Sequence, residues 1–378
     1  MSLLAKTRAM FQPGAASRSV GPIGVDFSLE ALHLVQLHRD VGGVPEVRAC
    51  SSTGYEGSRQ ELLESPLMFR SVLKRGLQSG KFHGKGAVVA MPTGMFRTLS
   101  INYQSGPSKK QEAAAILKAM KSRLDKPLGD YVIDYLPVNN RSKGDDRLAL
   151  VAVSEKEPVV EFLELCRKAG LTVEALEIGP VAVCRLVSSL SLRSGSGNVL
   201  VINSGRRSSY MTLISGADLL FDQEVSFGED SLIEQTAEAL DMPEPMARDL
   251  ILRTGLKSST HSNVQETIEA SGLASTMSEI LKPKFLKLVE DIKRVCLYAA
   301  AETRGGAVTQ VYLLGSIARW PGADELLSTL TGMDVANIPD PLTLFPSDDS
   351  KQAPVNNAAA SDIVVATGAA LRGLELDE

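Results

Sequence analysis

Cysteine and histidine are scarce in this sequence, with four residues of each among 378. The cysteines lie far apart and form no Cys-x-x-Cys pair, and the histidines are equally scattered. This spacing argues against a zinc site and against a disulfide framework, and it is typical of a protein from a reducing compartment. We therefore expect no metal site in the chain.

Long apolar runs and an excess of basic charge are also missing. No run of about 18 apolar residues occurs, so no membrane-spanning segment is expected. The net charge of −5 gives no electrostatic argument for nucleic-acid binding. Residues 1–20 contain basic residues without an apolar core, which indicates a flexible leader instead of a signal peptide. By default we expect a cytoplasmic protein.

The sequence does contain enough apolar residues for two folded domains, since hydrophobic residues make up 44% and charged residues 22% of the chain. The central stretch, residues 198–228, has three β-rich runs separated by polar turns, which predicts a hairpin meander. Its first turn, residues 203–209, is longer than a hairpin needs. Such a turn can present backbone N–H groups to an anion, although the turn alone favours an ordinary surface loop.

The first half of the chain opens with an apolar strand at residues 23–26 and a returning strand at 32–37. Ser65 followed by Pro66 predicts the start of a helix, with the serine as N-cap and the proline at the first helical position. Residues 86–91 are typical of a buried strand.

Residues 91–175 combine strands and helices in a pattern of their own. Strands are expected at 131–136 and 148–153. Ser108 and Ser154 each precede a Gln or Glu by three positions, which predicts a capped helix after both serines. This order of strand, helix, strands and helix indicates a small α+β insert.

The second half continues with helices and ends in small residues. Residues 285–300 carry apolar side chains at helical spacing, which predicts a long amphipathic helix. A strand at 310–314 runs into Gly315. Residues 363–371 predict a helix of small residues that packs closely against its neighbours.

An internal repeat links the two halves. Residues 23–37 and 199–214 each contain an apolar strand, an Asp or Asn, a polar turn and a β-rich return strand. Each of these segments opens one half of the chain. That duplication is the plan of the actin-like nucleotide-binding fold, in which two similar lobes face a cleft.

With these motifs in this order, the chain resembles the PilM family of type IV pilus assembly proteins, relatives of the cell-division protein FtsA. The resemblance covers nearly the whole length, from about residue 20 to the end. It rests on residues 23–26, 34–37, 126–128, 169–171, 177–182 and 366–373, and on Asp134, Gly205 and Gly228.

The resemblance implies an α/β fold of the actin-like (ribonuclease H-like) type, duplicated into two lobes, with a small α+β insert in the first lobe. The expected parts are a leader (1–20), the N-terminal part of the first lobe (21–90), the insert (91–175), the return helix of that lobe with a joint (176–197), and the second lobe (198–378). The chain end at 361–373 either stays with the second lobe or packs back on the first.

The resemblance also implies a function. A PilM-type protein of a bacterium is cytoplasmic and peripheral at the inner membrane. It binds ATP with Mg²⁺ and captures the cytoplasmic N-terminal tail of the inner-membrane protein PilN, which links the complex to the pilus assembly motor ATPase. We expect the insert and the adjoining first lobe to bind such a tail as a short extended or partly helical peptide.

The nucleotide motifs of that family are altered in this chain. The candidate cleft residues carried over from the family are Asp26, Ser28, Asn203, Gly205, Ser208, Ser209, Gly228 and Gly315. The first loop keeps Asp26 but has Ser28, Leu29 and Glu30 where Gly-Ser-Ser is expected. In the second loop Asn203 replaces an aspartate, and in the third Ser316 and Ile317 replace two glycines.

Each change weakens a nucleotide site. The lost glycine at Ser28 removes easy access to positive φ, and Asn203 weakens the anionic cradle for hydrated Mg²⁺. Glu30 opposes a phosphate, since two unit charges ~4 Å apart interact by about 4 kcal/mol at an effective dielectric of ~20. The sequence therefore favours a scaffold with a degenerate cleft over an enzyme. The alternative is an active ATP-binding or ATP-hydrolysing protein, either an FtsA-like filament or a sugar-kinase-like enzyme.

The same changes introduce charges that have no role in the family motifs. Glu30 lies in the first loop, and Arg206 and Arg207 lie in the second. In the actin-like plan these loops face each other, so an ion pair from Glu30 to one of the arginines is expected to bridge the lobes without nucleotide. The competing interpretation is that both arginines point into water.

Overall fold

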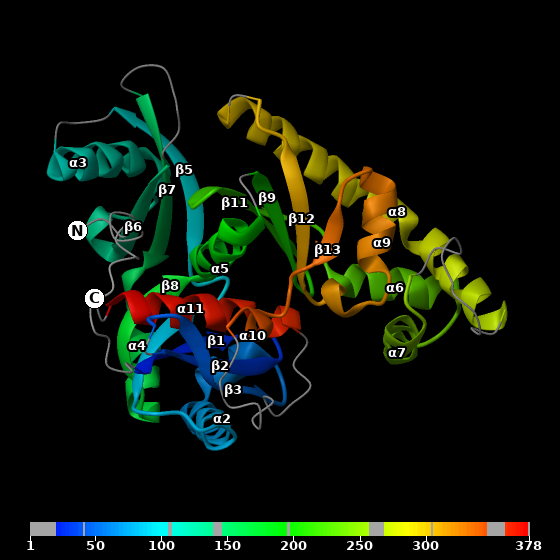
Figure 1. Cartoon of the computed structure of the whole chain (residues 1–378), viewed down its shortest axis with the longest axis horizontal. Helices are drawn as coiled ribbons and strands as arrows, with labels where there is room; N and C mark the ends of the chain where they lie inside the picture. The colour runs from blue at the N-terminus through cyan, green and yellow to red at the C-terminus, as the bar shows by residue number, and fades with distance from the viewer. Residues whose placement is uncertain are drawn as a thin grey trace.

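The computed structural model describes residues 20–40, 42–104, 108–138, 146–194, 197–256, 268–303, 305–345 and 360–376. Residues 1–19 of the expected leader lie outside these ranges. Two five-stranded sheets form two lobes, and a three-stranded sheet forms the core of an insert (Figure 1).

The first lobe is built on a sheet with the strand order β3-β2-β1-β4-β8. Its strands are β1 (Val20–Phe27), β2 (Ala31–Arg39), β3 (Pro45–Gly54), β4 (Gly86–Met91) and β8 (Thr172–Ile178). Its helices are α1 (Arg59–Glu64), α2 (Pro66–Gln78), α4 (Lys156–Ala169) and α5 (Gly179–Ser194). Ser65 caps α2 and Pro66 is its first residue, as the sequence predicted.

The second lobe repeats this plan, with the strand order β11-β10-β9-β12-β13. Its strands are β9 (Asn198–Ser204), β10 (Ser209–Ser215), β11 (Asp218–Val225), β12 (Val308–Gly315) and β13 (Val335–Asn337). In both sheets the central strand pairs antiparallel with the next strand along the chain and parallel with a later one. The repeat noticed between residues 23–37 and 199–214 thus corresponds to two equivalent hairpins, β1–β2 and β9–β10.

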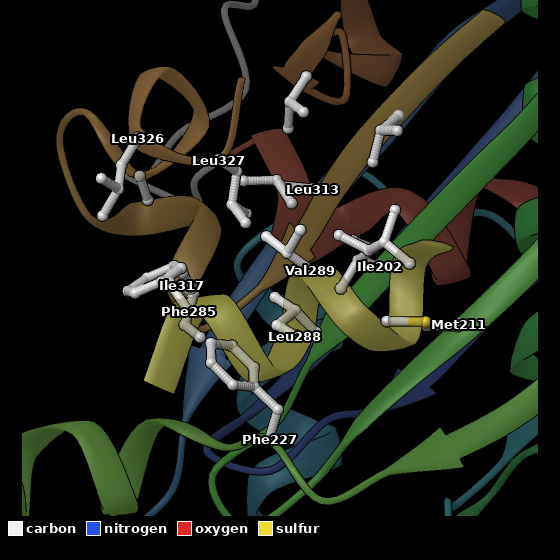
Figure 2. Close-up of a cluster of buried hydrophobic side chains, with 14 of the residues drawn as sticks. Ile202, Met211, Phe227, Phe285, Leu288, Val289, Leu313, Ile317, Leu326 and Leu327 are labelled. Atoms are coloured by element: carbon white, nitrogen blue, oxygen red, sulfur yellow. The ribbon is translucent and has the colours of Figure 1, made fainter. Parts of the chain in front are cut away.

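Helices cover the second sheet on its outer side. They are α6 (Glu229–Ala239), α7 (Glu244–Thr254), α8 (Ile268–Glu302), the 3-10 helix η4 (Ile317–Arg319) and α9 (Ala323–Thr331). The short helix α10 (Pro341–Leu344) packs instead on the core between the lobes. The long helix expected at 285–300 is part of α8. Its residues Phe285, Leu288 and Val289 pack with Ile202 and Leu313 of the sheet, and Figure 2 shows these side chains pointing toward one another. This apolar contact is the core of the second lobe.

The insert is smaller than the sequence suggested. Its sheet has the order β5-β7-β6, from β5 (Arg97–Gln104), β6 (Tyr131–Val138) and β7 (Asp146–Glu155). Helix α3 (Lys109–Met120) covers one face of this sheet, followed by two 3-10 turns, η2 (Lys121–Arg123) and η3 (Leu128–Asp130). Of the expected range 91–175, only 97–155 forms this unit. Helix α4 and strand β8 instead belong to the core and sheet of the first lobe, because α4 buries Phe162 and Cys166 there.

The opposite face of the insert sheet rests on the rest of the molecule. Val138 and Leu148 are buried in the core of the second lobe, and Leu150 joins the core between the lobes. The insert therefore cannot be removed without exposing apolar surface in the second lobe.

Helix α11 (Val364–Leu376), which follows the 3-10 turn η5 (Ala360–Ile363), packs on the first lobe against β1 and α5 (Figure 1). Small residues allow this close packing: a Cβ on Gly368 would lie 2.0 Å from the carbonyl oxygen of Ala182 in α5. A buried ion network holds the helix as well. Glu177 lies 2.5 Å from Arg185 Nη1 and 3.3 Å from Arg372 Nη1. Because α5 and α11 share one core with strands β2 and β9, this core joins the two lobes.

Candidate functional site

A cleft of about 1700 Å³ lies between the two lobes. The turn between β1 and β2, the turn between β9 and β10, and the segment that follows β12 all line it. Of the residues singled out from the sequence, those that line the cleft are Asp26, Ser28, Glu30, Asn203, Gly205, Arg206, Arg207, Ser208 and Gly315. The duplicated fold thus brings these separate motifs together.

Ser209 and Gly228 are not among the lining residues. Ser209 is fully buried, and its hydroxyl donates to the carbonyl oxygen of Phe227 at 2.6 Å. Gly228 precedes α6, and a Cβ at this position would lie 2.3 Å from the carbonyl carbon of Arg207. Both residues pack against the second turn on the side away from the cleft.

Internal hydrogen bonds make the first turn compact. The backbone N–H and the hydroxyl of Ser28 both donate to the carbonyl oxygen of Ala31, at 3.0 and 2.9 Å. The hydroxyl of Tyr55 donates to the carbonyl oxygen of Ser28. His33 Nε2 lies 3.1 Å from the Ser28 hydroxyl. Burial, together with the charge of Arg319, lowers the pKa of His33 to about 4, so the ring is neutral at physiological pH.

Backbone donors around the second turn are also engaged within the protein. The N–H of Gly205 donates to Ser208 O at 3.0 Å. The first two N–H groups of α6, from Glu229 and Asp230, donate to carbonyl oxygens of the same turn at 3.0 and 2.8 Å. The N–H of Ser316, in the third segment, donates to Ser204 O at 2.8 Å. These amides point at protein oxygens and not at the cleft.

Glu30 does reach across the cleft, but to a different arginine from those expected. Its Oε2 lies 3.6 Å from Nη2 of Arg319, which follows β12. Arg206 pairs instead with Asp230 of its own lobe at 3.0 Å, and Arg207 has no ion pair within the described ranges. The partner of Glu30 is therefore Arg319 in this structure. Leu29, the residue before Glu30, comes within 3.7 Å of where a Cβ on Gly205 would lie.

Asp26 and Arg59 lie deeper in the cleft. Arg59, from the first turn of α1, donates to Phe27 O at 3.3 Å and to Thr93 O at 2.6 Å. Burial raises the pKa of Asp26 to about 7; the positive charge of Arg59 opposes this rise and the carboxylate of Asp362 adds to it. The sequence interpretation missed Arg59, Arg319 and Asp362. Each reaches the cleft from a segment that carries none of the family motifs, so only the folded chain reveals them.

One end of the cleft is an apolar groove, formed by the first lobe and by the segment that leads from β4 toward the insert. Leu63, Leu165 and Met95 pack on the first-lobe core and line the cleft at this end. Val160 of α4 lines it as well and is 49% exposed. We call the following set the groove residues: Leu63, Pro66, Met95, Phe96, Val160 and Leu165.

Acidic side chains dominate the charge of the whole cleft. The lining carboxylates are Asp26, Glu30, Glu64, Glu161, Glu164, Asp222, Glu224, Asp230 and Asp362. The lining basic side chains are Arg59, Lys168, Arg206, Arg207 and Arg319. Because the carboxylates are in excess, the cleft favours cationic over polyanionic ligands.

A family model described as "Type IV pilus assembly protein PilM" matches residues 24–374. No curated protein matches the chain. No helix in the described part of the chain has the length and apolar character needed to cross a membrane.

Among solved structures, a chain of the "PilM-PilN type IV pilus biogenesis complex" is similar with a TM-score of 0.71 and 19% identity, over 94% of this chain and 98% of that one. The ethanolamine utilization protein EutJ from Carboxydothermus hydrogenoformans follows with a TM-score of 0.48 and 14% identity, over 95% and 91%. MreB5 of Spiroplasma citri bound to ADP gives 0.49 and 10%, over 94% and 97%. The match with a TM-score of 0.71 and the two equivalent five-stranded sheets give the actin-like fold that the internal repeat indicated.

Proposed function

Because the chain belongs to the PilM family of type IV pilus assembly proteins, we propose that it is a scaffold that captures the cytoplasmic tail of a PilN-like membrane protein. In this proposal the partner's tail holds the chain at the inner membrane as a peripheral protein. The cleft between the lobes does not turn over nucleotide. The scaffold also contacts the pilus assembly motor ATPase and so links it to the membrane protein.

The groove residues are the observation that carries this proposal. They leave an apolar strip open along the first lobe, beside the segment that leads into the insert, and Glu64 and Glu161 line the same cleft. An extended peptide with alternating apolar side chains and a basic residue fits such a strip, because apolar pockets select side chains and the carboxylates attract the charge. The tail of a PilN-like protein is the occupant that family membership suggests.

The cleft residues do not fit a magnesium nucleotide. A phosphate needs backbone N–H groups aimed at it, whereas those of Gly205, Glu229 and Asp230 are bonded to protein oxygens. Leu29 occupies space between the first two turns. The neighbouring carboxylate of Glu30 would repel a phosphate placed there. These features support a degenerate cleft.

The proposal is tested by calorimetry with the full chain and a synthetic peptide of the N-terminal cytoplasmic segment of the PilN homologue from the same genome. We expect binding, and we expect Val160→Asp to weaken it by about tenfold or more, because a charge would enter the apolar strip. Val132→Asp is the matched control, since Val132 is a similarly exposed valine on β6 outside the cleft. The control is expected to leave the affinity unchanged.

Equal losses in both variants, or no binding to the native chain, would contradict tail capture. Titration with ATP and Mg²⁺ in the same instrument is expected to give no heat of binding and no phosphate release. Micromolar affinity with turnover would instead support the alternative of an active ATPase.

A further inference from the structure

One surface outside the cleft has a charge opposite to that of the whole molecule. Helix α3 covers the outer side of the insert sheet, away from the second lobe (Figure 1). Its buried side is apolar, with Ile116 and Met120 facing the sheet. Its exposed side carries Lys110 and Lys118, and Lys121 follows its last residue in the same helical spacing.

No acidic side chain balances these lysines on α3. The single carboxylate of the helix, Glu112, is turned toward the sheet, where its Oε1 accepts a 2.6 Å hydrogen bond from the hydroxyl of Tyr103. The same oxygen lies 4.0 Å from Nη1 of Arg147. Within the described residues, the lysines of this face make no ion pair. The charges on the exposed side of α3 are therefore all positive, on a chain whose net charge is −5.

An apolar side chain lies among these charges. Leu117, between Lys110 and Lys121 on the same side, is 37% exposed. These lysines lie on the exposed surface of a helix and not in a pocket, and their ammonium groups are carried by flexible side chains. A single phosphate or a nucleic-acid base is usually held by the planar fork of arginine in a pocket. A convex lysine face with one aliphatic side chain fits a diffuse anionic surface better.

We propose that the exposed face of α3 docks on anionic phospholipid headgroups and turns the insert toward the membrane. Lys110, Lys118 and Lys121 supply the electrostatic attraction, and Leu117 reaches the headgroup layer. The acidic remainder of the chain is repelled by the same surface, so the contact fixes one orientation. This docking goes beyond tail capture, because it needs no partner protein.

The test is flotation of the full chain with vesicles of phosphatidylcholine alone or mixed with phosphatidylglycerol. We expect binding only to the anionic vesicles, with a bound fraction that falls when salt is raised from about 0.05 to about 0.3 M. Combined Lys110→Glu, Lys118→Glu and Lys121→Glu substitutions are expected to weaken binding by about tenfold or more. Leu117→Ser should weaken it less.

The matched control reverses three exposed lysines elsewhere, Lys74 on α2 with Lys287 and Lys293 on α8. It changes the net charge by the same amount and should bind like the native chain. Equal loss in both triple variants, or no binding to anionic vesicles, overturns the proposal. The α3 variant should keep its native affinity for the tail peptide, so failure on vesicles and failure of tail capture are separate outcomes. Unchanged thermal unfolding shows that both variants are folded.

Discussion

Asp222 is the carboxylate through which the second lobe meets the insert. Its Oδ1 accepts a hydrogen bond from the hydroxyl of Thr212 at 2.8 Å, and its Oδ2 accepts one from Thr98 of the insert at 3.3 Å. The side chain is only 7% exposed. Burial raises the pKa of Asp222 from 3.8 to about 6, although both hydrogen bonds act in the opposite direction.

This raised pKa predicts how stability changes with pH. Between pH 3.8 and 6 the folded chain keeps the Asp222 proton and the unfolded chain loses it, so the free energy of unfolding falls as pH rises. The loss is complete above pH 6. Asp222→Asn should therefore stabilise the chain at pH 8 by on the order of 2–3 kcal/mol, with little effect near pH 4.

Urea unfolding across this pH range measures the effect. Asp134→Asn changes an exposed carboxylate on β6 and is the control. It should leave the pH dependence of the free energy of unfolding unchanged. If Asp222→Asn has the same profile as the native chain, burial of the carboxylate does not limit stability.

At the scale of the elements, α11 shows why small residues occur where they do. A Cβ on Gly368 would lie 2.0 Å from Ala182 O, so Gly368→Ala has to push α11 and α5 apart. Alanine gains about 1 kcal/mol of helix propensity over glycine, but overpacking costs about 1–3 kcal/mol. We expect net destabilisation in urea unfolding.

Gly179→Ala is the comparison, because Gly179 is the first residue of helix α5 and a Cβ added there would meet no other atom within 4 Å. That variant should be neutral or slightly stabilising. If both variants have the same free energy of unfolding, α11 and α5 can move apart without a loss of stability.

Local signals in the sequence predicted many of these elements. Ser65 with Pro66 marks the start of α2, and Ser108 caps α3 as expected. Ser154 shows where local reasoning fails: it was expected to cap α4, but it lies in β7 and donates to Met95 O. Pairing with β6 extends that strand through its capping box, so tertiary contacts override the local signal.

The site was predicted only where it is continuous in sequence. Turns that carry family motifs, such as those around Asp26 and Gly205, were identified because a motif is a local pattern. Arg59 lies in a helix of six residues, too short to show a period, and its direction into the cleft depends on contacts with Phe27 and Thr93. The partner of Glu30 depends on how two lobes meet, which no single stretch of sequence contains.

At the scale of the whole molecule, the contacts between the lobes contribute very unequally to its stability. The shared core of α5 and α11 with β2 and β9 is fully buried, whereas the side chains of Arg319 and Glu30 are 36% and 47% exposed. Water screens an ion pair of that kind, so it contributes about 0.2–1 kcal/mol. The lobes are therefore held together by apolar packing, with the ion pair as a minor addition.

A double-mutant cycle on Glu30→Gln and Arg319→Gln, followed by urea unfolding, should give a coupling of about 0.2–1 kcal/mol. The same cycle with Arg207→Gln should give none, since no ion pair joins Arg207 to Glu30. Coupling that appears with Arg207 and is absent with Arg319 would favour the bridge first expected from the sequence.

The position of α11 on β1 also sets an order of events for a chain emerging from the ribosome. β1 is synthesised long before α11, so the first lobe waits with an uncovered sheet while the second lobe is still being made. A nascent chain in this state exposes apolar surface and is a substrate for chaperones. A chain that is truncated before α11 keeps this apolar surface of the first lobe exposed, and we expect it to be degraded faster than the full chain.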